Sequence, residues 1–337
     1  MSSTNITEMT GPRLVDKAEG EVAARNPGTD FHAGWIDAIR VNRTAVERRT
    51  ATLPGRRTVK KQWQAAWLVK AITCMDLTTL AGDDTPGRVR RLCAKARQPI
   101  RPDLSAALGI DGLAITTGAV CVYHEMVPTA VAALKGRGVS VAAVSTGFPA
   151  GLSPFQTRLA EIHASVAAGA DEIDIVIGRR HVLEADWKAV YDEVKAFREA
   201  CGEAHVKAII ATGELGSITK VAKASMACMM AGADFIKTST GMEKTNATLP
   251  VSLVMMRMIR EYLDRTGAAV GFKPAGGISS AKVALQYLML AKEELGAAWL
   301  DPHLFRFGAS RLLGDIERQL EHFVTGRYSA ANRHPMG

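Results

Sequence analysis

The sequence contains no apolar run that approaches the 18 or more residues of a membrane span. Its polar first residues, 1–7, also lack the apolar region of a secretory signal. We therefore expect a cytoplasmic protein without a membrane partner.

Paired cysteines and clustered histidines are missing as well. The cysteines are odd in number and widely spaced, with no CxxC pair, so the sequence suggests neither a disulfide framework nor a zinc site. The 8 histidines show no HxH or HExxH spacing, and no GxGxxG dinucleotide fingerprint follows any predicted strand. We expect reduced thiols, no metal and no cofactor. The cysteines are Cys74, Cys93, Cys121, Cys201 and Cys228.

Aromatic residues make up only 6% of the chain, which leaves few platforms for stacking nucleic-acid bases. The formal net charge is +8, but the basic residues are spread along the sequence. This distribution predicts a solvated surface that attracts small anionic molecules, and no nucleic-acid partner.

The 337 residues, 47% of them hydrophobic, are enough for one large α/β domain. We divide the chain into an N-terminal extension (1–65), a main domain (66–326) and a C-terminal tail (327–337). Within the extension, apolar spacing predicts one helix over Trp35–Arg49. From residue 66 onward, short apolar runs alternate with longer amphipathic stretches, which is typical of a parallel sheet.

Eight such βα units predict a (β/α)₈ TIM barrel, with an open doubly wound sheet as the alternative. The clearest helices are predicted at Pro154–Ala170, Ala185–Cys201, Ser217–Ala231, Pro250–Thr266, Ser279–Glu294 and Ala309–Val324. Ser217 and Ser279 are the expected N-caps, and Gly232 and Gly267 the expected C-terminal glycines. The predicted strands are Ala71–Leu77, Ala119–Tyr123, Val139–Val144, Glu172–Ile177, Val206–Ala211, Asp234–Thr238, Ala269–Lys273 and Leu304–Phe307.

Two lysines, Lys237 and Lys273, lie late in the sixth and seventh predicted strands. Barrel enzymes build their active sites at these strand ends. Like charges close together disfavour double protonation, and burial acts in the same direction, so one amine is driven toward its neutral form. A neutral lysine facing a carbonyl compound forms a Schiff base. The alternative is that each lysine is an interior residue paired with a carboxylate.

Asp174 is the matching acid or base. Its strand neighbours Ile173 and Ile175 point to the opposite face, so Asp174 is predicted to face the lysines. It can serve equally as a buried counter-ion. Asp76 at the end of the first strand is similar, and Thr78 is placed to orient it or a water.

Glycine-rich segments after the sixth, seventh and eighth strands predict a phosphate site, because free backbone N–H groups bind anions and glycine permits close approach. These segments are Thr238-Ser-Thr-Gly241, Ala275-Gly-Gly-Ile278 and Gly308-Ala-Ser310.

With these motifs in place, the chain resembles the deoxyribose-phosphate aldolase family, in particular its longer, eukaryotic-type members. The similarity runs in order from about residue 70 to 325. The segments that carry it are Met75-Asp-Leu-Thr-Thr-Leu80, Ala119-Val-Cys-Val-Tyr123, Glu172-Ile-Asp-Ile-Val176, Ala211-Thr-Gly-Glu-Leu215, Phe235-Ile-Lys-Thr-Ser-Thr-Gly241, Gly271-Phe-Lys-Pro-Ala-Gly-Gly277 and Phe305-Arg-Phe-Gly-Ala-Ser310.

The resemblance implies a metal-independent class I aldolase that reversibly cleaves 2-deoxy-D-ribose 5-phosphate to glyceraldehyde 3-phosphate and acetaldehyde in deoxynucleoside catabolism. It implies that Lys237 is the Schiff-base lysine, that Lys273 depresses its pKa, and that Asp174 relays protons. It assigns Lys207, Asp76, Thr78 and Cys121 to the substrate pocket. It also implies that Thr238, Gly241, Gly276, Gly277, Gly308 and Ser310 line the substrate and phosphate site.

Three positions depart from the family pattern. His124 stands where many members have proline, and Arg311 follows Ser310 where others have a small hydroxyl residue. The chain does not end in the tyrosine that short members use for proton transfer, so Tyr328 receives no such role. Two rival functions stay open at this point: another class I sugar-phosphate aldolase or transaldolase, and a non-catalytic barrel that binds phosphorylated ligands. We also expect a homo-oligomer, either a dimer or a tetramer.

Overall fold

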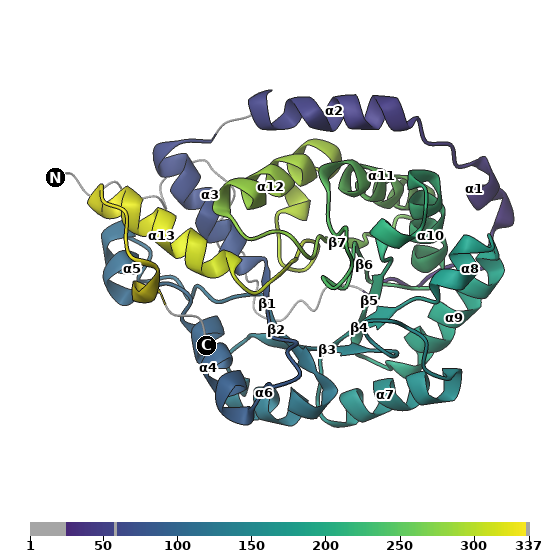
Figure 1. Cartoon of the computed structure of the whole chain (residues 1–337), viewed down its shortest axis with the longest axis horizontal. Coiled ribbons are helices and arrows are strands. Elements are labelled where there is room, and N and C mark those ends of the chain that lie inside the picture. The colour runs from purple at the N-terminus through teal and green to yellow at the C-terminus, as the bar shows by residue number, and fades with distance from the viewer. Residues whose placement is uncertain (1–24, 57–58, 335–337) are drawn as a thin grey trace.

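Eight parallel strands form a nearly closed barrel at the centre of the molecule, with helices around it (Figure 1). The computed structural model describes residues 25–56 and 59–334. The strands are paired in the order β7-β6-β5-β4-β3-β2-β1-β8. Bridges from Phe272 to Phe305 and from Ala275 to Gly308 join the two ends of this sheet. The predicted TIM-barrel fold is confirmed.

The strands are β1 (Met75–Thr78), β2 (Ala119–Tyr123), β3 (Ser140–Ser145), β4 (Glu172–Val176), β5 (His205–Ile209), β6 (Phe235–Lys237), β7 (Gly271–Lys273) and β8 (Phe307–Ala309). The helices are α1 (Ala33–Ala38), α2 (Arg43–Arg56), α3 (Lys61–Thr73), α4 (Pro86–Arg97), α5 (Pro102–Leu108), α6 (Val127–Leu134), α7 (Phe155–Ala167), α8 (Arg179–Leu183), α9 (Trp187–Ala200), α10 (Ile218–Met230), α11 (Leu249–Thr266), α12 (Ala281–Leu295) and α13 (Leu312–Thr325). Short 3₁₀ turns are η2 (His124–Met126), η3 (Thr212–Glu214), η4 (Ala297–Trp299) and η5 (Ala331–Arg333).

Successive side chains along each strand point alternately into the barrel and outward toward the helices. Ile173 and Ile175 of β4 join the apolar layer between the strands and the helices, whereas Asp174 points into the barrel toward the lysines. Gly271 of β7 is required here because a Cβ atom at this position would lie 2.3 Å from the ring of Phe235. The barrel interior therefore carries the polar side chains, and the outer layer carries the core.

Three element predictions were wrong. The eighth strand was predicted at Leu304–Phe307, but β8 covers Phe307–Ala309, so Ala309 belongs to this strand and the last helix starts at Leu312. Residues Ala71–Thr73 belong to α3 and not to the first strand, which starts at Met75. A short apolar run does not distinguish a buried helix from a buried strand. The single helix predicted over Trp35–Arg49 is two helices, α1 and α2, because Asn42 accepts a hydrogen bond from the Ala45 N–H and starts a new helix.

The helix ends agree more closely with the prediction. The hydroxyl of Ser217 caps α10, and Gly267 ends α11 with φ +74°. The expected cap at Ser279 was wrong by one residue, since Ser280 accepts the hydrogen bond from Val283. The predicted boundary between residues 65 and 66 stays a prediction; α3 runs across it.

The described part of the N-terminal extension is attached to the barrel by Asn26, which is buried. Its side-chain amide donates to the carbonyl oxygens of Met229 (2.8 Å) and Ala233 (2.9 Å), and its Oδ1 accepts from the Tyr262 hydroxyl at 3.0 Å. The backbone N–H of Asn26 donates to Asp234, which precedes β6. The extension thereby holds the segment that leads to Lys237.

Replacing Asn26 by alanine is expected to lower the free energy of unfolding by about 3 kcal/mol, because buried partners lose their hydrogen bonds. Urea unfolding followed by circular dichroism measures this change. Thr29→Ala is the matched control: among the described residues its hydroxyl donates only to the neighbouring Asp30 carbonyl, at an exposed site, so a change within about 0.5 kcal/mol is expected. Equal effects of the two substitutions would contradict the docking role of Asn26.

The C-terminal segment folds back on α13, the helix that packs against α5 (Figure 1). His334 contacts Glu321 at 2.7 Å, and Arg333 pairs with the same carboxylate at 3.0 Å. Tyr328 is 78% exposed and packs on His322, so it does not contact the lysines. Among the described helices, none combines the length and apolar character needed to cross a membrane.

Candidate active site

Seven charged side chains meet inside the barrel, and all are buried. Neighbouring strands supply them: Glu172 and Asp174 come from β4, Lys207 from β5, Lys237 from β6 and Lys273 from β7. Asp76 of β1 and Arg306, just before β8, complete the charge cluster. Register brings the lysines together, since Asp174 lies opposite Lys207 and Lys237 lies opposite Lys273.

Asp174 is the point at which both predicted catalytic lysines converge. Lys237 Nζ and Lys273 Nζ each donate to its Oδ2 at 2.7 Å, and Lys207 Nζ donates to its Oδ1 at 3.2 Å. Lys273 also donates to Asp76. Lys237 has Asp174 as its one carboxylate partner among the described residues. The expected orientation of Asp174 toward the lysines is confirmed.

The three lysines differ in their electrostatic surroundings. Burial lowers the pKa of Lys237; the Asp174 carboxylate opposes this shift, and the nearby Lys273 ammonium adds to it. Burial alone would lower the pKa of Lys273 too, but Asp174 and Asp76 together raise it above its usual range. The pKa of Lys207 is raised for the same reason by Asp174, Glu172 and Asp76. Lys237 is therefore the lysine of this cluster that loses its proton first.

The carboxylates stay ionised. Burial would raise the pKa of Asp76, but Lys273, Arg306 and Lys207 lower it below its usual range. The pKa of Asp174 is likewise lowered well below its ordinary value, because the attraction of the lysines outweighs the cost of burial. Each carboxylate is already occupied by cations, and within residues 25–56 and 59–334 no group of three or more metal-binding side chains is arranged to hold a metal ion.

Glu172 and Arg306 belong to the charge cluster although no role was predicted for them. Arg306 donates to Asp76 at 2.6 Å and to Glu172 at 2.8 Å, and Lys207 donates to Glu172. Both residues lie two positions before a predicted site residue, Asp174 and Gly308 respectively. Period-two alternation was the signal that places them on the inner face.

The remaining predicted pocket residues lie at the edges of the cluster. Cys121 is buried in a small apolar group with Ala142 and Val144, and burial raises the pKa of its thiol. The Thr78 hydroxyl donates to the carbonyl of its own neighbour Asp76 at 2.8 Å. The Thr238 hydroxyl accepts from the Ala275 N–H at 3.0 Å and so connects β6 to the loop after β7.

The loop after β7 presents free backbone donors. Gly276 and Gly277 both have φ +78°, and among the described residues no acceptor takes their N–H groups. No side chain caps the N-terminus of α13 at Arg311. Ser310 and Arg311 are exposed beside this helix start. Free N–H groups at glycines and at a helix N-terminus form a site for an anion.

Two other predicted phosphate residues have their N–H groups occupied. The Gly241 N–H donates to the Glu243 carboxylate at 3.1 Å, and Glu243 also accepts from the Thr240 N–H. The Gly308 N–H donates to the Pro274 carbonyl at 2.9 Å. Gly241 still borders the loop, since a Cβ atom there would lie 3.9 Å from Gly276 Cα. These two glycines shape the site, and their amides serve the fold.

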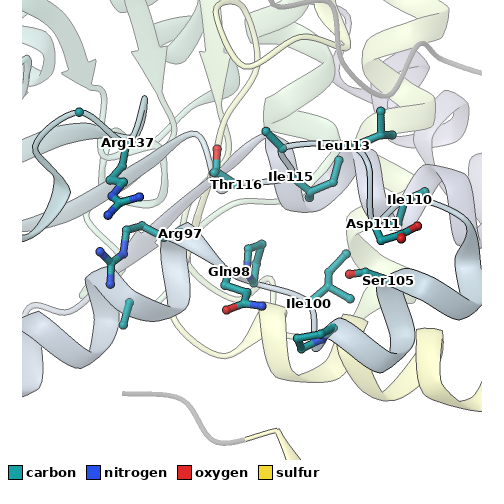
Figure 2. Close-up of a pocket in the computed structure, with 15 residues that line it drawn as sticks. Arg97, Gln98, Ile100, Ser105, Ile110, Asp111, Leu113, Ile115, Thr116 and Arg137 are labelled. Atoms are coloured by element: carbon teal, nitrogen blue, oxygen red, sulfur yellow. The ribbon is translucent and has the colours of Figure 1, made fainter.

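A separate pocket of about 770 Å³ lies away from this cluster. Thr116 and Arg137 on its wall precede β2 and β3, so the pocket is at the N-terminal end of the strands, opposite the lysines. Figure 2 shows Arg97 and Arg137 at one end of this pocket and Asp111 at the other. Its position separates it from the active site.

Comparison with known proteins agrees with this geometry. Residues 70–316 match the family described as DeoC/LacD family aldolase. Deoxyribose-phosphate aldolases from Bos taurus and Homo sapiens are each 58% identical over 317 residues, which is 94% of this chain and 100% of each relative.

Two solved structures share the fold at lower identity. The tetrameric deoxyribose phosphate aldolase from Aeropyrum pernix has a TM-score of 0.54 at 22% identity and covers 83% of this chain and 99% of its own. The aldolase QR15 has a TM-score of 0.58 at 24% identity, with 75% and 96% covered. The match over residues 70–316 and the high identity to full-length relatives mean that this chain belongs to the DeoC/LacD family of aldolases.

Proposed function

We infer that this protein is a class I deoxyribose-phosphate aldolase, a lyase that reversibly converts 2-deoxy-D-ribose 5-phosphate into D-glyceraldehyde 3-phosphate and acetaldehyde in deoxyribonucleotide catabolism. The observation that carries this conclusion is the shared carboxylate. Lys237 and Lys273 both donate to Asp174 Oδ2 at 2.7 Å, yet only Lys237 has a lowered pKa. Lys237 is thus the amine of the pair that gives up its proton more readily and acts as the nucleophile, and Lys273 stays a cation.

In the first chemical step, neutral Lys237 attacks C1 of the open-chain sugar and forms a carbinolamine. The carbinolamine oxygen takes up a proton and leaves as water, which generates the protonated imine. Asp174 lies between the two amines and is placed to pass protons between Lys237 and Lys273. The Lys273 ammonium stabilises negative charge that develops on the substrate oxygen.

In the second step, the bond between C2 and C3 breaks. Its electron pair moves to the protonated imine and gives an enamine, while the C3 hydroxyl loses its proton and becomes the aldehyde of glyceraldehyde 3-phosphate. A proton is then added to C2 of the enamine, and water hydrolyses the imine. This releases acetaldehyde and restores the Lys237 amine.

The phosphate group is proposed to bind where backbone donors are free. Gly276 and Gly277 supply N–H groups from the loop after β7, and the uncapped start of α13 supplies the positive end of a helix dipole. Arg311 stands at that helix start and adds a cation. Ser310 adds a hydroxyl, while Thr238, Gly241 and Gly308 shape the surrounding loops.

Reduction of the imine tests the mechanism directly. The protein is incubated with acetaldehyde and borohydride, digested, and its peptides are mapped by mass spectrometry. A reduced two-carbon adduct on Lys237 is expected. A folded protein that binds deoxyribose phosphate without forming this adduct would instead be a non-catalytic barrel. Activity on ketose phosphates in place of the deoxy-aldose would indicate another class I aldolase or a transaldolase.

Gly276→Ala is expected to lower kcat/KM for the phosphorylated sugar by about 10²-fold, because a small misplacement of a bound group has this effect. Its φ of +78° disfavours any side chain, and a Cβ atom would lie 2.6 Å from Asn246 Cβ. Activity on unphosphorylated 2-deoxyribose is expected to fall much less. Steady-state kinetics with both sugars measures the difference.

Gly112→Ala is the matched control for Gly276→Ala. No heavy atom lies within 4 Å of a Cβ at Gly112, and this glycine precedes β2 at the other end of the barrel. Its kinetics should equal those of the wild type. Equal losses on the two sugars in Gly276→Ala would mean that the loop supports the whole site and not the phosphate.

The oligomeric state, the cytoplasmic location and the division at residues 65 and 326 stay predictions. Light scattering coupled to gel filtration distinguishes a monomer from the expected dimer or tetramer.

A further inference from the structure

Arg306 and Glu172 form a second layer of the charge cluster beneath the lysines. The two terminal guanidinium nitrogens of Arg306 donate to Asp76 Oδ1 at 2.6 Å and to Glu172 Oε1 at 2.8 Å. Glu172 Oε2 accepts from Lys207, and the other oxygen of Asp76 accepts from Lys273. Arg306 has no direct contact with Lys237, so any effect on the nucleophile passes through these shared carboxylates.

The cluster contains one cation more than it has carboxylates. Its cations are Lys207, Lys237, Lys273 and Arg306, and its carboxylates are Asp76, Glu172 and Asp174. A buried unpaired charge is costly, so the closed cluster is neutral only when one cation gives up its proton.

Arginine does not give up its proton in proteins, and two of the lysines are held by two or more carboxylates. Among the described residues, Lys237 is held by Asp174 alone, and it is the most exposed of the three lysines, with 4% of its side chain accessible. The surplus charge is therefore released at Lys237.

We propose that Arg306 and Glu172 are positioning residues that set the protonation state of Lys237 by fixing the charge balance of the barrel interior. Arg306 supplies the surplus positive charge that favours loss of the Lys237 proton. Glu172 limits that surplus to one positive charge. This inference rests on the proposed function, in which neutral Lys237 is the nucleophile.

Among the described residues, Asp174 is the carboxylate that pairs with Lys237, so the charge balance of the cluster acts on this amine through Asp174. The groups that face Lys237 are Asp174 from β4, Lys273 from β7 and Cys121 from β2, whose thiol stays neutral because burial raises its pKa. His205 and Asp171 lie at the far side of the cluster, near Glu172. The pKa of His205 is lowered chiefly by burial, which keeps this imidazole uncharged at neutral pH.

The test compares how two substitutions move the acidic limb of the pH profile. Glu172→Gln removes a negative charge, so the acidic limb of kcat/KM and of Lys237 trapping should move to lower pH by about one unit. Arg306→Met removes the surplus cation, so the same limb should move to higher pH by about one unit. At a pH below the acidic limb of the wild type, kcat/KM of Arg306→Met should then be about 10-fold lower than that of the wild type.

Two further variants separate charge from packing. Arg306→Lys keeps the charge and loses the forked hydrogen bonds, so its limb should stay at the wild-type pH while its melting temperature falls. The double variant Glu172→Gln/Arg306→Met again has one surplus cation, and its limb should return to the wild-type pH. A merely structural layer would lower stability in all four variants and leave the limb where it is.

The proposal is overturned if the acidic limb moves in the same direction in the two single variants, or does not move in either. It is also overturned if the double variant keeps the pH shift of one of the single variants. Glu172→Gln is nearly isosteric, so it decides the question alone if Arg306→Met does not fold. A wild-type protein that forms no Lys237 adduct would refute the proposed function instead. The two failures are thus distinguishable.

Discussion

Replacing Lys237 by leucine is expected to lower kcat for the cleavage of 2-deoxyribose 5-phosphate by about 10⁴-fold or more. The variant has no amine at the position where the imine forms, and the pKa of Lys273 is raised, so Lys273 stays protonated and does not take over. Borohydride trapping with acetaldehyde should give no adduct at residue 237. Retained activity in a folded variant would refute the Schiff-base mechanism.

The leucine variant is expected to fold, which makes its loss of activity interpretable. Asp174 keeps Lys207 and Lys273 as partners, so no carboxylate is left unpaired. Because the pKa of Lys237 is lowered in the folded state, the unfolded chain binds more protons at this site. The wild type therefore gains stability as the pH rises toward the ordinary lysine value of about 10.4.

The leucine variant should lack that part of the pH dependence, and its free energy of unfolding at pH 7 should lie within about 1 kcal/mol of the wild type. Urea unfolding at several pH values measures both. Lys223→Leu is the control for activity, since this half-buried lysine of α10 lies over the Trp187 ring, outside the charge cluster, and its replacement should leave kcat unchanged.

The sequence predicted the barrel because each strand is a short apolar run with a helix after it. It did not predict where α3 ends and β1 begins, because Ala71, Ile72 and Met75 are all buried and a short apolar run fits a buried helix as well as a buried strand. It also missed the break between α1 and α2. That break depends on the cap at Asn42 and on the burial of Ile36 and Ile39, which apolar spacing does not reveal.

The sequence predicted that Asp174, Lys237 and Lys273 face one another, but it did not predict the balance of charges around them. Alternation correctly placed Asp174 on the face of Lys237 and Lys273. The same alternation places Glu172 and Arg306 on the inner face. The role of a buried Arg or Glu cannot be inferred, however, until its partner on a distant strand is known. The hydrogen bond from the Gly241 N–H to the Glu243 carboxylate depends on a turn conformation that the sequence pattern does not specify.

Asp174→Asn is expected to separate imine formation from turnover. The substitution removes the one carboxylate that holds Lys237, whereas Lys207 keeps Glu172 and Lys273 keeps Asp76. Loss of a negative charge disfavours the protonated amine, so the pKa of Lys237 falls further and the acidic limb of trapping moves to lower pH. Lys237 is therefore at least as readily deprotonated as in the wild type and should still be trapped with acetaldehyde.

Turnover is expected to fall by about 10²- to 10⁴-fold, which is the typical contribution of a positioned acid or base. The asparagine amide cannot carry protons between Lys237 and Lys273, so dehydration of the carbinolamine and hydrolysis of the imine both slow. The measurement is the ratio of the trapping rate to kcat, compared with that of the wild type at the same pH. This ratio should rise.

Asp171→Asn is the matched control for Asp174→Asn, because it changes a carboxylate just before the same strand. Asp171 accepts a hydrogen bond from the Val141 N–H at 2.8 Å and, although it lies near Glu172, it forms no ion pair with the described lysines or with Arg306. Its ratio of trapping to turnover should equal that of the wild type. If trapping and turnover fall together in a folded Asp174→Asn protein, Asp174 acts by holding Lys237 in place and not by moving protons. If turnover is unchanged, the proton passes by a route that avoids this carboxylate, and the shared Oδ2 contact of the two lysines is structural.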